Sequence, residues 1–302
     1  MSSPPAPIEY SEGRYRELIE AEARHWERSD FDPVNPQLWD DPELHGITLG
    51  APHRHLVERA ARHARVLELG CGDGDLSLEI AGRGARVTGL DVSEVRVVRA
   101  ETEAAARGLG ARATFRAADL NRVELPAGAF DCVVAHDALH HILELERLLD
   151  QVERTLVPGG ALVVSDFVGA GRWEKLAFAI GYAALPTMMP YRTKWARRGR
   201  AKAFLASEEQ KREAATQGTA PLDDSSPFEG VSQESIVSAI GRRFEVLETF
   251  TFCPLWYHLV PKLRIPGAGR RALLRLFRPI DSALHGARFT RGSYVFIEGR
   301  RR

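Results

Sequence analysis

The segment Val66–Gly74 constrains the fold of this chain more than any other part of its sequence. It reads Val-Leu-Glu-Leu-Gly-Cys-Gly-Asp-Gly, so an apolar run ends in a turn that contains Gly70, Gly72 and Gly74. The apolar run predicts a buried strand, and glycine permits the positive φ angles of a tight turn. A helical pattern follows at 75–82, and the free N–H groups at the start of such a helix favour a polar or anionic ligand. The segment therefore predicts a strand, a ligand-binding turn and a helix.

Strands and helices alternate along the chain after this segment. The pattern predicts strands at 65–69, 86–91, 114–117, 130–135 and 161–166, and helices at 75–82, 94–108 and 143–156. Such alternation indicates βαβ units, a parallel sheet and helices on both of its faces. A further helix at 232–241 and strands at 244–252 and 293–298 complete the pattern. We expect an α/β fold with a doubly wound, mostly parallel sheet of seven strands and helical lid insertions.

The remaining segments divide the chain into four regions. We expect a tail and a cap helix in residues 1–52, with the tail at 1–9, the helix at 11–29 and a loop at 30–52. Residues 53–167 form the ligand-binding core, and 168–230 form a lid insertion. Residues 231–302 end the sheet and carry a second, basic insertion at 253–289, expected to be irregular around one basic amphipathic helix. Both insertions leave from carboxyl ends of strands, so we expect them to cover the site.

Three acidic residues accompany the glycine turn. Glu68 precedes the first glycine by two positions, Asp91 ends the next strand, and Asp119 follows the third strand. A carboxylate at the position of Asp91 can accept hydrogen bonds from both hydroxyls of a ribose. The glycine spacing is GxGxG, whereas a GxGxxG spacing would favour NAD or FAD. A generic dinucleotide-binding turn for NAD is the alternative interpretation, but it leaves Glu68 and the later motifs unexplained.

Together these motifs resemble the class I S-adenosylmethionine-dependent methyltransferases, in the group that acts on small molecules. The resemblance covers about residues 60–167 and includes the Pro158-Gly159-Gly160 turn before the fifth strand. It implies S-adenosylmethionine as the cofactor, with the ribose bound by Asp91. By the same resemblance, Asp119 and Leu120 flank the adenine, and Glu68 and the turn face the methionine part. The cofactor-binding residues that it implies are Glu68, Gly70, Cys71, Gly72, Gly74, Asp91, Val92, Asp119, Leu120 and His136.

The segment 136–141 places several titratable side chains after the fourth strand. It reads His-Asp-Ala-Leu-His-His, and open α/β sheets bind their ligands at this carboxyl edge. A histidine can remove a proton from a hydroxyl, so His136, His140 and His141 are the candidate catalytic residues. Related enzymes carry a similar Leu-His-His run, where one histidine acts as a base or only shapes the pocket. Both roles stay open here. The run is unlike the Asn-Pro-Pro-Tyr motif of DNA and protein amino-methylating enzymes, which disfavours those substrates.

The composition limits the partners and the location of the chain. The formal net charge is zero, and the three cysteines are widely spaced without a CxxC pair. We therefore expect neither a disulfide framework nor a zinc site, and a reducing cytoplasm. The start MSSPPAP has no basic or apolar leader region, and the longest apolar stretch is too short to span a membrane. No acidic triad of the catechol type suggests a catalytic metal. The sequence gives no indication of an oligomeric state.

The two insertions are basic and aromatic. Six cations lie between Arg192 and Lys202 without an acid, and residues 261–302 carry a net charge of +9. The aromatic run at 255–260 precedes an amphipathic basic helix at 270–277. An anionic small substrate, an anionic lipid surface or a nucleic acid could bind here, or the face could simply be solvated. Enclosure by the insertions makes nucleic acid unlikely.

We therefore predict an enzyme that methylates a small organic acceptor, anionic or amphiphilic, at oxygen. The first alternative is a methyltransferase at the membrane surface that acts on a lipid-linked or prenyl substrate. The second is a non-catalytic protein that binds S-adenosylmethionine or a nucleotide.

Overall fold

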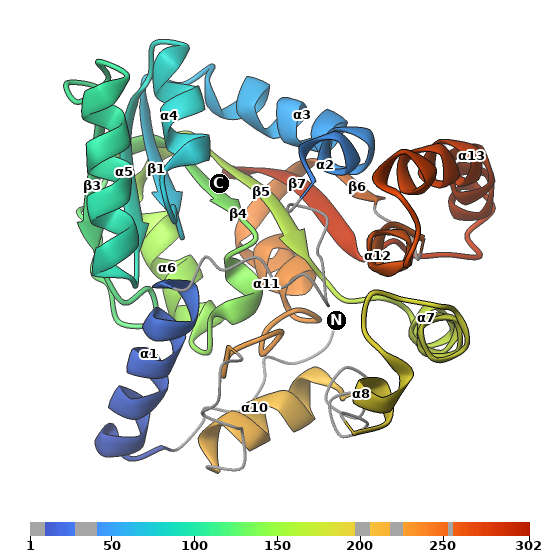
Figure 1. The fold of residues 1–302 in the computed structure, drawn as a ribbon. Coiled ribbons are helices and arrows are strands. Elements are labelled where there is room, and N and C mark those ends of the chain that lie inside the picture. Colours follow the sequence, from blue (N-terminus) through green and yellow to red (C-terminus); the bar gives the residue numbers. More distant parts are fainter. Residues whose placement is uncertain (1–9, 28–40, 197–205, 218–225, 253–255) are drawn as a thin grey trace.

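A computed structural model describes residues 10–27, 41–196, 206–217, 226–252 and 256–302 (Figure 1). It is built on a seven-stranded sheet with the order β3-β2-β1-β4-β5-β7-β6. The strands are β1 Arg65–Leu69, β2 Arg86–Asp91, β3 Ala113–Ala117, β4 Phe130–His136, β5 Leu156–Phe167, β6 Phe244–Phe252 and β7 Tyr294–Arg301. The first five strands run parallel, and β7 lies between β5 and β6, antiparallel to both. The predicted α/β fold with seven, mostly parallel strands is confirmed.

Helices cover both faces of this sheet. The α-helices in the described ranges are α1 Glu12–Glu27, α2 Pro42–Thr48, α3 Gly50–Ala60, α4 Asp75–Gly82, α5 Glu94–Ala106, α6 Leu145–Thr155, α7 Arg172–Ala184, α8 Tyr191–Ala196, α10 Glu208–Thr216, α11 Ile236–Arg243, α12 Trp256–Leu259 and α13 Gly267–Gly286. One apolar core joins α3, α4 and α5 to the sheet, and a second joins α6 and α11 to the opposite face. Alternate residues of β1 serve the two cores, because Val66 points to the first and Leu67 to the second. Burial on both faces explains why the central strands are continuously apolar.

Two smaller apolar clusters join the covering segments to the sheet. One contains Leu44 of α2, Tyr257 of α12, Leu274 of α13 and Tyr294 of β7. The other contains Leu18 of α1 with side chains of α10 and the segment 226–231. Both clusters lie near the carboxyl ends of β4 and β5, where a ligand is expected. The covering segments are therefore attached by buried apolar contacts of their own.

Two boundary predictions are wrong. Residues 30–52 were expected to be a loop, but α2 occupies 42–48 and α3 begins at Gly50. Asp41 caps α2 by accepting the N–H groups of Glu43 and Leu44, and Pro42 occupies the first turn, so the start signal is a standard one. The insertion at 253–289 is not irregular within the described residues, because α13 runs to Gly286 through Pro279.

The other differences concern single elements. The fifth strand begins at Leu156, which pairs with Phe130 before an irregularity in the register. The helix predicted at 232–241 lies at Ile236–Arg243. The predicted tail at 1–9 and the part of the loop at 30–40 lie outside the described residues. Among the described helices, none is both long and apolar enough to cross a membrane.

Candidate functional site

Three glycines let the chain turn sharply between β1 and α4. Gly70, Gly72 and Gly74 adopt positive φ angles of 73°, 51° and 87°, a region in which other side chains are strained. A Cβ atom at Gly70 would also lie 2.6 Å from Cβ of Ala138. Glycine is therefore required both for the turn and for its close approach to the segment that follows β4.

Asp91, at the end of β2, holds this turn in place. Its Oδ2 atom accepts the N–H of Gly72 at 2.8 Å, and its Oδ1 atom accepts the N–H of Ser93 at 2.9 Å. Each carboxylate oxygen has a second lone pair, so both can still accept a hydrogen bond from a ligand. Asp91 is thus oriented by the backbone and remains able to bind hydroxyl groups.

Glu68 and Cys71 lie beneath the turn. Glu68 is 2% exposed and accepts a hydrogen bond from the hydroxyl of Ser77. Burial raises the pKa of Glu68 to about 8, against the opposing effect of the Ser77 hydrogen bond. The sulfur of Cys71 is buried so close to Gly89 that a Cβ atom there would lie 2.8 Å from it. Both side chains support the turn and are absent from the wall of the cavity beside it.

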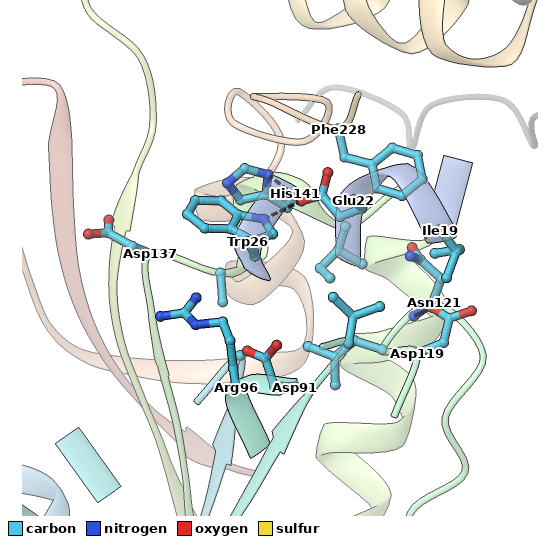
Figure 2. A pocket seen from close by; sticks show the side chains of 15 residues that line it. Ile19, Glu22, Trp26, Asp91, Arg96, Asp119, Asn121, Asp137, His141 and Phe228 are labelled. Atoms are coloured by element: carbon cyan, nitrogen blue, oxygen red, sulfur yellow. Dashed lines mark hydrogen bonds and ion pairs between the residues drawn. The ribbon is translucent and has the colours of Figure 1, made fainter. Parts of the chain in front are cut away.

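A cavity opens beside the turn, and it is lined mainly by α1, by Gly70 and by the segments that follow β2, β3 and β4. Figure 2 shows Asp119, Asn121 and Ile19 at one side of the view, Asp91 beside Arg96 near the middle, and Asp137 at the other side. Six of the predicted cofactor-binding or catalytic residues line it. They are Gly70, Asp91, Val92, Asp119, Leu120 and His141.

Helix α1 forms one wall of this cavity. The hydroxyl of Tyr15 donates to Oδ2 of Asp119 at 2.6 Å, which ties α1 to the end of β3. One turn later, Ile19 lines the cavity, and Trp26 lines it near the end of the helix. The guanidinium of Arg96 lies 5.8 Å from the centre of the Trp26 ring, a cation–π distance. The N-terminal helix therefore contributes directly to the site.

His141 is held in a buried ion pair with the same helix. Its Nδ1 atom lies 3.2 Å from Oε1 of Glu22, and its Nε2 atom lies 3.7 Å from Glu229. Glu22 also accepts the indole N–H of Trp26 and the hydroxyl of Ser226, both at 2.6 Å. Burial disfavours the charged form of the ring, but the attraction of Glu22 and Glu229 is larger than this effect and raises the pKa of His141 to about 9. His141 is therefore protonated at neutral pH.

His140 forms a different pair with Asp166 of β5. Its Nδ1 atom lies 2.6 Å from Oδ1 of Asp166, and Oδ2 of Asp166 accepts the N–H groups of Ala138 and Leu139. Burial opposes ionisation of Asp166, yet His140 and these amides outweigh it and hold its pKa below the usual value. Asp166 therefore orients the ring of His140 through its Nδ1 atom, in the way that a carboxylate orients a histidine base.

His136 lies apart from the cavity wall. Its Nδ1 atom is 3.2 Å from the carbonyl oxygen of Ser165, and its ring centre is 5.7 Å from that of His53. Burial lowers the pKa of His136, so its ring is neutral near pH 7. Of the three predicted histidines, the structure thus brings His140 and His141 together, with ring centres 4.1 Å apart, and sets His136 to one side.

Two buried polar atoms beside the cavity have no partner within the described residues. They are Nε of Arg96, a donor, and Oδ1 of Asp137, an acceptor. Asp137 is also one of two described non-glycine residues with a positive φ angle, at 50°. Such strain is commonly retained at functional sites. Burial raises the pKa of Asp137 to about 7. This part of the cavity is therefore suited to a ligand that carries both a carboxylate and a cation.

Aromatic side chains continue from His140 towards the covering helices. The ring centre of Phe167, at the end of β5, lies 5.7 Å from that of His140 and 5.6 Å from that of Tyr294. His258 of α12 lies beyond them, and its Nε2 atom is 2.6 Å from the hydroxyl oxygen of Ser293. Burial lowers the pKa of His258 to about 4. An aromatic, uncharged wall therefore adjoins His140.

Several basic residues of the insertions have structural partners. Arg271 pairs with Glu43 at 2.7 Å, Arg270 donates to the carbonyl oxygen of Pro261 at 3.0 Å, and Lys194 donates to two carbonyl oxygens near the end of α7. The run from Arg197 to Lys202 lies outside the described residues.

Two groups of described residues have the spacing of metal ligands. They are His140, His141 and Glu229, and Asp137, His140 and Asp166. The histidine–carboxylate pairs described above account for both arrangements without an ion.

Sequence reasoning missed several of these residues. Glu22 and Trp26 lie on a helix distant in sequence, and only tertiary contacts place them in the site. Arg96 reads as a surface residue of α5. Asp166 could have been predicted from the sequence, because it is an acid at the end of the strand beside β4, where it can pair with His140.

Known proteins resemble the central part of the chain. A family model described as a methyltransferase domain matches residues 66–160. The 27-O-demethylrifamycin SV methyltransferase of Amycolatopsis mediterranei is 32% identical over 151 residues, which cover 46% of this chain and 56% of that protein. The demethylmenaquinone methyltransferase of Thermus thermophilus is 38% identical over 118 residues, covering 38% and 53%. The chain thus spans about half the length of these curated relatives.

Solved structures share the fold over a longer range. The crystal structure of a (4+2)-cyclase, SpnF, superposes with a TM-score of 0.53 at 20% identity and covers 99% of both chains. That identity supports the fold alone. The matched domain, the turn with Asp91 and the sheet order lead to one conclusion: residues 66–160 form a methyltransferase domain on a class I α/β sheet, and its cofactor is S-adenosylmethionine.

Proposed function

We propose that the chain transfers a methyl group from S-adenosylmethionine to a hydroxyl of a small organic acceptor, with His140 as the general base. The observation that carries the proposal is the buried His140–Asp166 pair beside the glycine turn. A histidine oriented by a carboxylate can take a proton from a hydroxyl, whereas an amine acceptor that is already neutral needs no base.

The residues that line the cavity suit the successive chemical groups of the cofactor, from the adenine through the ribose to the methionine part. Asp119 and Leu120 would flank the adenine at one end, and Asp91 would accept the ribose hydroxyls in the middle (Figure 2). The unpartnered donor of Arg96 suits the carboxylate of the methionine part, and the unpartnered oxygen of Asp137 suits its ammonium group. When bound, S-adenosylmethionine supplies an electrophilic methyl group attached to a positive sulfur.

Helix α1 would close this cavity against water. Tyr15, Ile19 and Trp26 cover it, and the Glu22–His141 pair fixes the helix to the segment after β4. Exclusion of water strengthens the interactions within the site and aligns the acceptor with the methyl group. We extend this role to the insertion at 168–230 and to the basic insertion at 253–289, as covers of a core at 53–167.

His140 is a better base than the other two histidines. His141 is already protonated at neutral pH, because its pKa lies near 9, so it cannot accept a proton. Neither His136 nor His140 is among the residues that line the cavity, but the Nδ1 atom of His136 lies at a backbone carbonyl oxygen and not at a carboxylate. The ring of His140 is oriented by Asp166 and lies beside His141, which does line the cavity, and beside Phe167. The Nε2 atom of His140 would hold the proton released by the acceptor hydroxyl.

The names of the relatives support a lipophilic acceptor, and one of them names oxygen as the methylated atom. One acts on a demethylrifamycin at an oxygen, and another on demethylmenaquinone. The aromatic wall formed by Phe167, Tyr294 and His258 suits a large apolar body of that kind. We accordingly propose phenols and hydroxylated polycyclic or polyketide compounds as the class to test first. The sparse cysteines, of which Cys71 and Cys132 are unbridged, support a cytoplasmic location.

The test is to compare His140→Gln with His141→Gln in a methyl-transfer assay on a panel of such acceptors. The His140 variant should lower turnover by about 10²–10⁴-fold at neutral pH while its affinity for S-adenosylhomocysteine stays near normal. The His141 variant should mainly weaken cofactor binding, because it releases α1. Full activity of His140→Gln would exclude His140 as the base. If no acceptor is methylated although the cofactor binds, the non-catalytic alternative is favoured.

A further inference from the structure

The outward face of α7 is apolar along its length. Trp173, Leu176 and Ile180 follow one another at helical spacing, and Trp173 is 81% and Ile180 61% exposed. Ala177, Ala183 and Ala184 complete this face, and all three are exposed. A helix on the surface of a globular protein normally turns polar side chains outward. Because α7 instead exposes apolar side chains, we expect this face to contact a partner.

Helix α13 also exposes a row of apolar side chains. It is attached through Leu274 and Asp281, which are buried, whereas Leu276, Ile280 and Leu284 point outward. Leu276 is 64% exposed, and the stripe that it begins recurs every four residues. Just beyond the helix, Phe289 is 79% exposed. Two helices from different insertions therefore each expose a row of large apolar side chains.

The charge around these rows is positive. Arg275 and Arg278 are exposed on α13, and Arg288 and Arg291 follow it. Each of the two helices contains one acidic residue, Glu174 in α7 and Asp281 in α13, and both are buried. An apolar surface flanked by cations, on two helices that expose no acid of their own, suits a partner with an apolar interior and an anionic rim.

The two helices also belong to the same part of the molecule. The short helix α12 packs against α7 and against α13 (Figure 1). It carries His258, whose ring contacts Phe167 and thereby adjoins His140. The apolar surface therefore lies on the covering elements nearest the aromatic wall of the site.

From these observations we propose that the outward faces of α7 and α13, with Phe289, bind the surface of an anionic lipid bilayer. The exposed apolar side chains would enter the acyl boundary, and the arginines would contact the lipid headgroups, as in amphipathic helices that lie in the membrane interface. This inference does not rest on the proposed reaction. Together with the position of α12, it would let an acceptor dissolved in the bilayer reach the site directly.

The experiment is co-sedimentation of the full chain with vesicles of phosphatidylcholine alone and of phosphatidylcholine mixed with phosphatidylglycerol. The chain should bind the mixed vesicles and bind the neutral ones more weakly, and high salt should reduce the difference. The variant Leu276→Ser/Ile280→Ser should lower the partition coefficient by about tenfold or more, since two large apolar side chains leave the membrane. Arg275→Gln/Arg278→Gln should lower it by about fivefold per charge at low salt.

A matched control is Val98→Ser on α5, because Val98 is also an exposed apolar side chain, but on another element. It should leave vesicle binding unchanged. Calorimetry with S-adenosylhomocysteine and thermal unfolding should show that all variants are folded and bind the cofactor normally, which separates this proposal from the proposed function. The proposal is overturned if the unmodified chain ignores both kinds of vesicle, or if Leu276→Ser/Ile280→Ser binds as well as Val98→Ser. It is also overturned if light scattering finds a dimer that this double variant dissociates, since the surface would then belong to a second copy.

Discussion

The ion pair between Glu22 and His141 should make the stability of the fold depend on pH. His141 has a pKa raised from 6.5 to about 9, so its contribution is complete below pH 6.5 and is lost as the pH rises through about 9. The pKa of Glu22 is lowered, because the attraction of His141 outweighs burial, so its contribution is lost as the pH falls below 4.5. A change of this size in the pKa of His141 corresponds to about 3 kcal/mol in the free energy of unfolding.

The perturbation is Glu22→Gln, which keeps the size of the side chain and an acceptor for the Trp26 N–H. Denaturant unfolding between pH 6.5 and about pH 10 should show a decline in the free energy of unfolding for the unmodified chain. The decline should be smaller in the variant, by up to about 3 kcal/mol. Glu17→Gln, on an exposed position of the same helix, is the control and should behave like the unmodified chain. Equal pH dependence in Glu22→Gln and the unmodified chain would refute the reasoning.

Two further predictions concern the cavity. The affinity for S-adenosylhomocysteine should rise as the pH increases through 7 and level off above it, because burial raises the pKa of Asp137 to about 7 and only its carboxylate pairs with an ammonium group. Calorimetry of Asp137→Asn should show weaker binding without this pH dependence, and an unchanged profile would contradict the role. Gly70→Ala should lower the thermal midpoint and cofactor affinity together, at a cost of about 1–3 kcal/mol for a strained φ angle. Gly110→Ala, where no atom lies within 4 Å of an added Cβ, should have little effect.

The sheet could be predicted because its signals are local. The glycine turn, the apolar runs and the alternation with helices are all short-range patterns, and the strands at 65–69, 86–91 and 244–252 begin and end where expected. The sequence predicts a loop in place of helix α2, because this segment has a high content of Pro, Asp and Gly. The signal for a helix lies in its cap. Asp41 and Pro42 mark its start, and packing against α13 stabilises it.

The site could be predicted in part for the same reason. Gly70, Asp91 and Asp119 follow strands of a parallel sheet, so topology alone places them at one edge. The choice between His140 and His141 could not be made from the sequence. It depends on Asp166, Glu22 and Glu229, which come from three distant segments and give the two rings different carboxylate partners.

The central claim is that S-adenosylmethionine binds at the glycine turn with its ribose on Asp91. The most direct measurement is calorimetric titration of the chain, and of Asp91→Ala, with S-adenosylhomocysteine and separately with NAD. S-adenosylhomocysteine should bind the unmodified chain with a Kd of about 1 µM, or roughly −8 kcal/mol. Asp91→Ala should weaken this binding by about two orders of magnitude, because it removes the ribose acceptor and the hydrogen bond to Gly72. Binding of NAD in place of S-adenosylhomocysteine, or equal affinity in Asp91→Ala, would contradict the account.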